Sequence, residues 1–94
     1  MVNRPPAGDT TIIDVRTPDE YASGHIKGAV NIDYLDDAFE SHIAKLDPAK
    51  PYLLYCHSGH RSSEAKSVMM EKGFKQVSDI KGGILAWKGE IVQE

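Results

Sequence analysis

One six-residue segment, CHSGHR at residues 56–61, constrains the fold of this chain more than any other feature. It follows the run PYLLY at residues 51–55, which is short, apolar and aromatic and therefore predicts a buried strand. It precedes residues 62–72, where apolar side chains recur at helical spacing and Gly73 is placed to end a helix. The segment is therefore expected to be a turn between a strand and a helix N-terminus. Backbone N–H groups at such a turn have no helical partners and can bind an anion.

The only cysteine of the chain, Cys56, opens this turn, and Arg61 closes it. A helix N-terminus and a nearby guanidinium both favour a thiolate over a thiol, so we expect Cys56 to be an exposed, anion-handling nucleophile. Arg61 is expected either to neutralise an anionic substrate or to brace the turn by pairing with an acid such as Asp14 or Glu20. The candidate substrate-binding residues of the turn are His57, Ser58, Gly59, His60 and Ser62.

Strands and helices alternate along the rest of the chain. Further strands are predicted at residues 10–15, 29–32 and 76–80, and further helices at residues 17–24, 35–46 and 83–88. Thr17 and Glu20 flank Pro18 in the pattern of a capping box with proline at the first helical position. This alternation predicts an α/β domain with a parallel sheet, and ligands of such sheets bind beyond the carboxyl ends of the strands.

Size and charge restrict the classes of function. The 94 residues suit one domain at residues 10–90, with a flexible lead-in at 1–9 and a tail at 91–94. The net charge of −3 and the scattered cations give no support to a nucleic-acid or membrane partner. No apolar run is long enough to span a membrane, and no signal peptide is visible. We therefore expect a cytoplasmic location, or a periplasmic one if a signal peptide has been removed.

The spacing Cys-x-x-Gly-x-Arg after a strand resembles the active-site loop of the rhodanese (thiosulfate sulfurtransferase) family. Three further blocks resemble the family and occur in its order. They are IDVRTP at residues 13–18, followed by Glu20 and Tyr21, GHIKGA at 24–29 and GGILAW at 82–87. Each block alone is a weak signal, but together they cover residues 12–89, which is nearly the whole chain.

The resemblance implies a three-layer α/β/α domain with a small parallel sheet of four to five strands. It also implies an enzyme that moves a sulfane sulfur from a small anionic donor such as thiosulfate, through a persulfide on Cys56, to cyanide or a thiol. The acceptor thiol can belong to a small molecule or to a protein. No cofactor is expected, because the cysteine itself carries the sulfur. Asp14, Arg16 and Glu20 are expected to support the loop, either facing the substrate or forming a structural set of ion pairs.

Several alternatives remain open at this point. A cysteine phosphatase or arsenate reductase uses a similar loop, but with five residues between cysteine and arginine where this chain has four. A rhodanese-like binding or regulatory module and a persulfide carrier are the alternatives outside small-molecule catalysis. His57 and His60 could tune the cysteine or contact the acceptor. A metal site is not expected, since zinc usually needs three or four protein ligands and only His25 and His42 remain.

Overall fold

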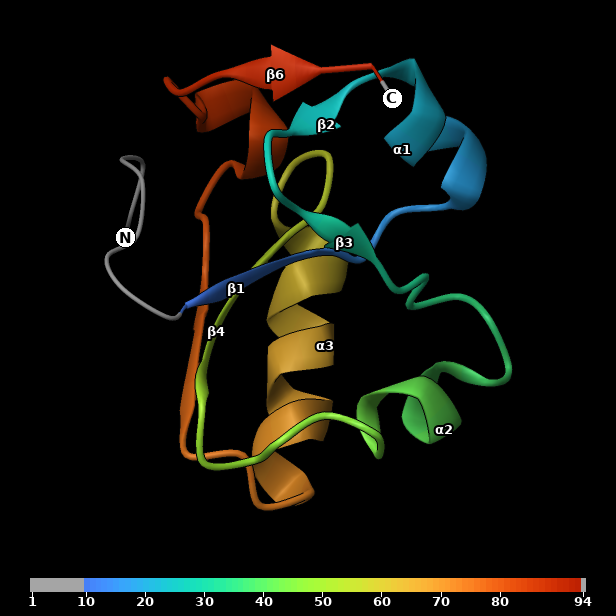
Figure 1. Ribbon diagram of the computed structural model, residues 1–94, viewed down its shortest axis with the longest axis vertical. Helices are drawn as coiled ribbons and strands as arrows, with labels where there is room; N and C mark the ends of the chain where they lie inside the picture. The colour runs from blue at the N-terminus through green and yellow to red at the C-terminus, as the bar shows by residue number, and fades with distance from the viewer. Residues whose placement is uncertain (1–9, 94) are drawn as a thin grey trace.

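The computed structural model describes residues 10–93, so the predicted lead-in at 1–9 lies outside the described residues (Figure 1). Its main sheet is parallel and has the strand order β3–β1–β4–β5. These strands are β1 (Thr11–Asp14), β3 (Val30–Asn31), β4 (Pro51–Tyr55) and β5 (Gln76–Asp79). The strands β1 and β4 are paired, with Asp14 opposite Tyr55. The segments that follow these two strands therefore leave the sheet at the same edge.

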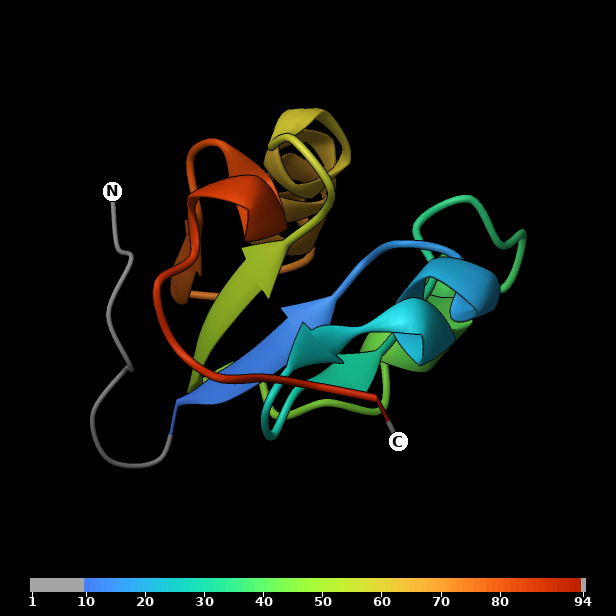
Figure 2. The same ribbon diagram turned by 90° about the horizontal axis from the view of Figure 1, so that it is seen from above.

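The core has two halves, one on each face of the sheet, because successive strand residues point to opposite faces. Ile13 and Leu54 belong to the half that packs against α2 (Phe39–Ile43) and α3 (His60–Glu71). The other half holds Ile12 and Leu53 and is covered by α1 (Pro18–Ser23) and the short 3₁₀ helix η1 (Gly83–Ala86). Figure 2 shows the strands side by side with α3 against one face. The predicted three-layer α/β/α fold is confirmed.

The first helix begins as the sequence predicts. Thr17 is the N-cap of α1: its side chain accepts from the backbone N–H of Glu20, while the Glu20 carboxylate accepts from the N–H of Thr17. Pro18 occupies the first turn, where its missing N–H costs nothing. This capping box fixes the Glu20 side chain at the start of α1, a position that matters for the site described below.

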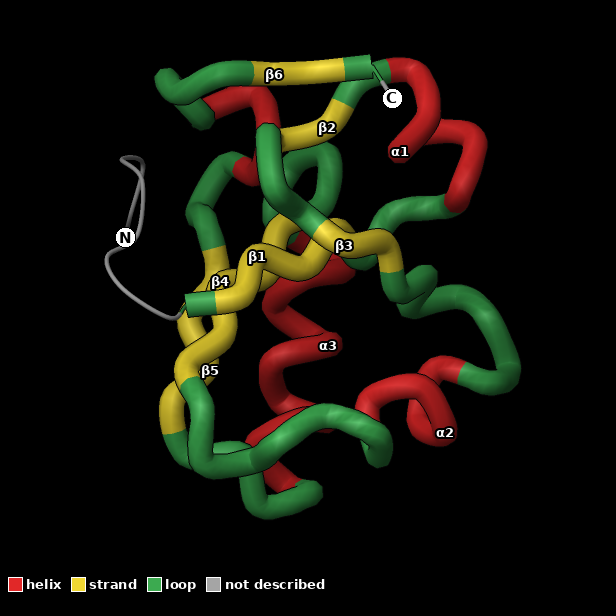
Figure 3. The backbone as a smooth tube through the Cα atoms, viewed as in Figure 1, coloured by secondary structure: helices red, strands yellow, loops and turns green. Residues whose placement is uncertain are grey.

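The helix predicted at residues 35–46 is wrong in extent, since α2 covers only Phe39–Ile43. The backbone N–H groups of Leu35 and Ala38 donate to the side chains of Asp33 and Asp36 in turns that take the place of the first turn of the predicted helix. Aspartates compete with the backbone in this way and favour turns. As a result Leu35 lies 63% exposed rather than on a buried helical face. Figure 3 shows α2 near the C-terminal half of α3, where Lys72 pairs with Glu40 at 2.7 Å.

The segment predicted as a tail at residues 91–94 contains a short strand. This strand, β6 (Ile91–Val92), pairs antiparallel with β2 (His25–Ile26), which the sequence analysis also missed. Both strands are two residues long, so periodicity could not reveal them. Together they form a second, two-stranded sheet at the end of the molecule where the α3 N-terminus lies (Figure 1).

A buried polar network ties the sheet edge together. Asp14 is fully buried, and its carboxylate accepts from the Arg16 guanidinium at 2.7 Å and from the Tyr55 hydroxyl at 2.8 Å. The same hydroxyl accepts from the backbone N–H of Ile26 at 3.0 Å. Arg16 also donates to the carbonyl of Gly24 at 2.7 Å. One carboxylate thus links the ends of β1 and β4 to the start of β2.

This network predicts the effect of Tyr55→Phe. The substitution removes two hydrogen bonds and leaves the buried N–H of Ile26 without its partner. The free energy of unfolding should fall by about 1–3 kcal/mol, as for other buried groups left unsatisfied. Urea denaturation measures it. The matched control is Tyr52→Phe, whose hydroxyl donates one bond to the carbonyl of the exposed Asp47. Equal losses in both variants would contradict the structural role of the network.

Candidate active site

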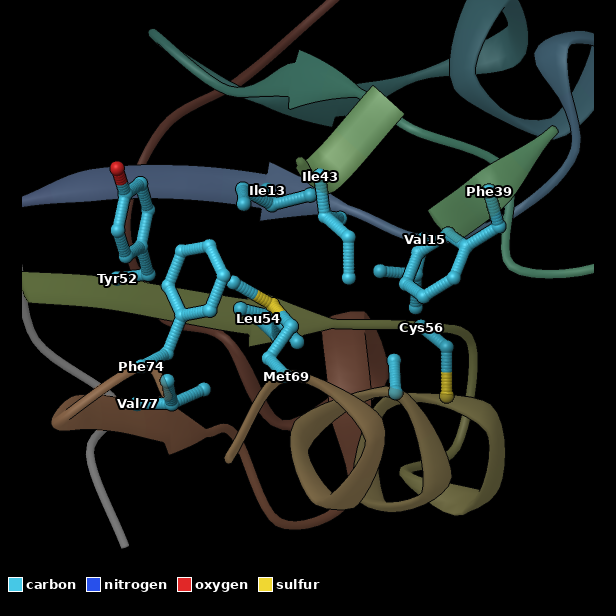
Figure 4. Close-up of a cluster of buried hydrophobic side chains, with 11 residues drawn as sticks. Ile13, Val15, Phe39, Ile43, Tyr52, Leu54, Cys56, Met69, Phe74 and Val77 are labelled. Atoms are coloured by element: carbon cyan, nitrogen blue, oxygen red, sulfur yellow. The ribbon is translucent and has the colours of Figure 1, made fainter. Parts of the chain in front are cut away.

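The Cys56 loop leaves the end of β4 and enters α3 at His60, two residues before the predicted start. Gly59 is the N-cap and has a φ of +107°, a left-handed conformation that glycine adopts without strain. The prediction that Cys56 is exposed is wrong. The residue is only 1% exposed, and it lies at one end of the core cluster that contains Val15 and Phe39 (Figure 4). The thiol therefore lies at the base of the loop, beneath exposed residues.

Hydrogen-bond donors of the loop converge on the Cys56 sulfur. The backbone N–H of Gly59 donates to Sγ at 3.0 Å. The sulfur also contacts the Ser62 hydroxyl at 3.6 Å, where the thiol is the donor and the hydroxyl in turn donates to the carbonyl of Gly59 at 3.3 Å. If the thiol ionises, the rotatable Ser62 hydroxyl can reverse and donate to the sulfur. The amides of Ser58 and Ser62 also interact favourably with the charged sulfur.

These donors decide the ionisation of Cys56. Burial raises the pKa of the thiol, but hydrogen bonds from the backbone and hydroxyl of Ser62 and from the amides of Gly59 and Ser58 outweigh it. The net result is a pKa below the usual value of 9.0. The sequence predicts that the helix N-terminus and Arg61 lower this pKa. The helix N-terminus does so through the amide of Ser62, together with the loop amides, whereas Arg61 is not among the causes and is paired with Glu20.

Ser62 provides a direct test of this electrostatic origin. In Ser62→Ala the thiolate loses one donor, so the pKa of Cys56 should rise. The rate of alkylation by iodoacetamide, measured against pH, should reach its midpoint at higher pH than in the parent protein. The control is Ser63→Ala, because the Ser63 side chain is exposed and its residue contacts the loop only through its backbone. Superimposable profiles for Ser62→Ala and the parent would contradict this role of the hydroxyl.

Arg61 forms a bidentate ion pair with Glu20. Its two terminal nitrogens donate to the two carboxylate oxygens at 2.9 and 3.1 Å. Of the two roles left open for Arg61, the structure shows the pairing with an acid, and the acid is Glu20. The guanidinium also interacts electrostatically with the Cys56 thiolate, whose charge adds to the effect of Glu20 in raising the pKa of Arg61. The pair joins α1 to the first turn of α3.

The same pair makes stability depend on pH. The hydrogen bonds from Arg61 lower the pKa of Glu20 from 4.5 to about 2, against the opposing effect of burial. A carboxylate with a depressed pKa stabilises the folded state above its unfolded pKa and stops doing so as it becomes protonated. The pair therefore contributes fully above about pH 4.5, and its contribution is lost as the pH falls to about 2.

Asp14 and Arg16 form an ion pair of their own, separate from the pair of Glu20 with Arg61. The Arg16 guanidinium is held by Asp14 and lies 5.6 Å from the centre of the Tyr55 ring. Burial lowers the pKa of Arg16, but its hydrogen bond to Asp14 and the charge of that carboxylate leave the pKa raised. Asp14 and Arg16 are 0% and 5% exposed. Their contacts are those of a structural pair, which is one of the two roles the sequence analysis left open.

The remaining loop residues with exposed side chains lie above Cys56 at the protein surface. His57, Ser58 and His60 are exposed, and His60 lies 3.4 Å from Glu64 one helical turn along α3. Among residues 10–93, no three His, Cys, Asp or Glu side chains are grouped so that they could hold a metal ion. Within the same residues no helix has the length and apolarity needed to cross a membrane.

The comparison with known families identifies the domain. The family model of the rhodanese-like domain matches residues 2–90. The chain belongs to the rhodanese-like domain family. A thiosulfate sulfurtransferase GlpE of Stutzerimonas stutzeri is 32% identical over 77 residues, covering 82% of this chain and 69% of that protein. The tRNA uridine(34) hydroxylase of Pelagibacter ubique is 40% identical over 84 residues, but the match spans 88% of this chain and only 28% of the hydroxylase.

Solved rhodanese structures share the fold. A rhodanese-related protein of Thermoplasma volcanium has a TM-score of 0.81 at 30% identity, covering 90% of this chain and 85% of that one. An Escherichia coli structure described as rhodanese with anions has a TM-score of 0.76 at 29% identity, covering 90% of this chain and 99% of that one. Family membership supports a sulfurtransferase-type enzyme, whereas the substrate differs among relatives and is treated below as a proposal.

Two glycines of this rhodanese domain support the loop from behind, and the sequence analysis gave them no site role. The backbone of η1 lies against the loop, with the N–H of Ile84 donating to the carbonyl of Cys56 at 2.9 Å. Gly83 has a φ of +64°, and a side chain there would overlap the carbonyls of Cys56 and His57. Gly82 faces Gly59 in the same contact. The signal was the double glycine, which marks a close approach of two backbones.

We therefore expect Gly83→Ala to displace the Cys56 loop. Both the thermal stability and the alkylation rate of Cys56 at neutral pH should fall, because a methyl group cannot fit against the two carbonyls. Differential scanning fluorimetry and timed alkylation measure these effects. Gly28→Ala is the matched control: Gly28 has a φ of +88°, and a methyl group there meets nothing within 4 Å. A similar loss of alkylation in the control would show that backbone strain, not the steric clash with the two carbonyls, is responsible.

Proposed function

We propose that the protein is a sulfurtransferase that carries a sulfane sulfur as a persulfide on Cys56. The observation that carries this proposal is the set of donors around the sulfur, with the Gly59 amide at 3.0 Å and a lowered thiol pKa. A lowered thiol pKa increases the fraction of thiolate, which is the nucleophilic form of cysteine. The donors then remain in place to stabilise a sulfur anion that has grown by one atom.

The proposed reaction has two steps. In the first, the Cys56 thiolate attacks the sulfane sulfur of thiosulfate, the S–S bond of the donor breaks with its electron pair, and sulfite leaves. The enzyme then holds a persulfide, Cys56–S–S⁻. In the second, cyanide or a thiolate attacks the outer sulfur, the enzyme S–S bond breaks, and the Cys56 thiolate is regenerated. Charge and atoms balance in both steps, and the cycle needs no cofactor because the transferred sulfur never leaves a covalent carrier.

The loop fits a sulfur atom better than a phosphate group. Four residues separate Cys56 from Arg61, and the amides nearest the sulfur come from Ser58, Gly59 and Ser62. Phosphatases and arsenate reductases need a wider ring to surround a tetrahedral oxyanion. In addition, a phosphate ester would need the arginine charge that Glu20 already occupies here. Sulfur transfer is therefore favoured over phosphoryl transfer.

A binding module or a dedicated carrier would also contain this fold. A persulfide carrier would differ from the enzyme only in its acceptor, which would be a thiol of another protein that approaches the exposed side of the loop. The intact Cys56, Gly59 and Arg61 favour chemistry over simple binding, because a binding module has no need of an activated thiol. A single unpaired cysteine that cycles through its thiolate suits a reducing compartment such as the cytoplasm.

The decisive experiment is intact mass spectrometry after incubation with thiosulfate and removal of excess donor. We expect a gain of about 32 Da, one sulfur atom, that disappears when cyanide is added and thiocyanate forms. The same treatment of Cys56→Ser should give no adduct. Circular dichroism should confirm that this isosteric variant is folded, since Cys56 is part of the core cluster.

Two outcomes would contradict the proposal. Turnover retained in Cys56→Ser would remove Cys56 as the sulfur carrier. No adduct in the parent protein with thiosulfate or with an organic persulfide, while Cys56 still reacts with iodoacetamide, would favour a binding role.

A further inference from the structure

The arginine of the loop is already neutralised, and this bears on which sulfur donor the site accepts. Both terminal nitrogens of Arg61 are bound to Glu20, at 2.9 and 3.1 Å. Glu20 is fixed in turn by the capping box, since its Oε1 also accepts from the backbone and the hydroxyl of Thr17, each at 3.1 Å. A carboxylate held by its own helix cannot swing away without breaking the start of α1. The pair therefore acts as a fixed, neutral unit at the site.

Other charged side chains beside the loop are also paired or acidic. The buried guanidinium of Arg16 is occupied by Asp14 and by the carbonyl of Gly24. Asp33 is a further acid near Arg61, because its charge also raises the Arg61 pKa. His60, at the entrance, lies beside Glu64. Stabilisation of an anion at the Cys56 sulfur thus comes mainly from amide dipoles, not from the charge of Arg61 or Arg16.

Possible donors differ in the charge that they bring. Thiosulfate carries two negative charges, and most of its charge lies on a sulfonate that extends away from the sulfane sulfur. An organic persulfide carries at most one charge at the reacting end, on the sulfur itself. The amides near Cys56 can stabilise charge on sulfur, whereas a sulfonate outside the loop would need a free cation.

We propose that Glu20 is a specificity-determining residue: by occupying Arg61 it makes this site favour a low-charge organic persulfide over thiosulfate as sulfur donor. The inference rests on the proposed sulfurtransfer function and narrows its substrate class. The Cys56 thiolate attacks the terminal sulfur of R–S–SH, the donor S–S bond breaks, and R–S⁻ leaves. The proton of the transferred sulfur moves to that thiolate, so the products are R–SH and Cys56–S–S⁻.

The test compares the two donors in Glu20→Gln. Glutamine retains an oxygen that accepts from Thr17, so the capping box survives, while the negative charge opposite Arg61 is removed. We expect kcat/KM for thiosulfate to rise about tenfold, mainly through a lower KM, because an unpaired cation attracts the dianion. With 2-hydroxyethyl persulfide as the low-charge probe, whose carbon chain bears no ionised group, kcat/KM should change less than about twofold. The gain with thiosulfate should shrink as salt screens the freed charge.

Asp19→Asn is the matched control. Asp19 is the neighbouring acid in the first turn of α1, is exposed, and loses the same unit charge without touching Arg61. Its ratio of kcat/KM values for the two donors should stay at that of the parent. The double variant Glu20→Gln/Arg61→Gln removes both charges and should return the ratio toward the parent value. A folding defect would instead lower activity with both donors together, so the ratio separates charge from structure.

The outcomes are distinct. A parent protein that prefers thiosulfate over 2-hydroxyethyl persulfide, or a donor ratio that is equal in Glu20→Gln and Asp19→Asn, would overturn the assignment of Glu20 while leaving the persulfide mechanism intact. Failure of both donors to load Cys56 in the parent would overturn the proposed function and the donor preference with it.

Discussion

The active-site end of the structure depends on one buried carboxylate. Asp14 is fully buried in a small domain, and an isolated charge there would be strongly unfavourable. Arg16 neutralises it and the Tyr55 hydroxyl binds it, so the charge becomes a cross-link between β1, β4 and β2. Removing one partner of such a buried pair typically costs about 3–5 kcal/mol, because the other charge remains in the core. Cys56 follows Tyr55 directly, so the network that fixes Tyr55 also fixes where the sulfur leaves the sheet.

Cys56, the proposed nucleophile, is buried and yet has a lowered pKa, because its neighbours include backbone N–H groups that stabilise the thiolate. A cysteine in an apolar core is normally inert, since burial favours the neutral thiol. Here the left-handed Gly59 turns its own amide toward the sulfur, and α3 starts at the next residue. The close contact of Gly83 with the far side of the loop keeps those amides in place. The donors are therefore oriented before any substrate arrives, which is the condition for stabilising a charge without reorganisation.

The parts of this arrangement that depend on local chemistry could be predicted from the sequence. The capping box of Thr17, the strand before Cys56 and the turn into α3 follow from short-range patterns. What failed depended on local competition or on long-range pairing: the side chain of Asp33 accepts from Leu35 in a turn that replaces the first turn of the predicted helix, and Ile91–Val92 became a strand only by meeting β2. The burial of Cys56 was also beyond the sequence, because it requires Phe39 of a distant helix to cover the same cluster. The choice of Glu20 as the partner of Arg61 follows from the way α1 meets α3.

The two carboxylates of the site perform different physical tasks, and their burial explains the difference. Asp14 is enclosed, so its effect is geometric: it positions backbone and cannot respond to a ligand. Glu20 has a side chain 34% exposed and faces an arginine whose side chain is 22% exposed, so its effect is on the field that an incoming anion meets. A loop that relied on its arginine for anion binding would gain nothing from a carboxylate locked onto it by a capping box. The pairing is consistent with a site in which amides stabilise charge on sulfur and the arginine holds α1 and α3 together. In the proposed reaction, selectivity toward the donor would follow from the sulfonate charge of thiosulfate, which the paired Arg61 does not compensate, and not from the shape of the loop alone.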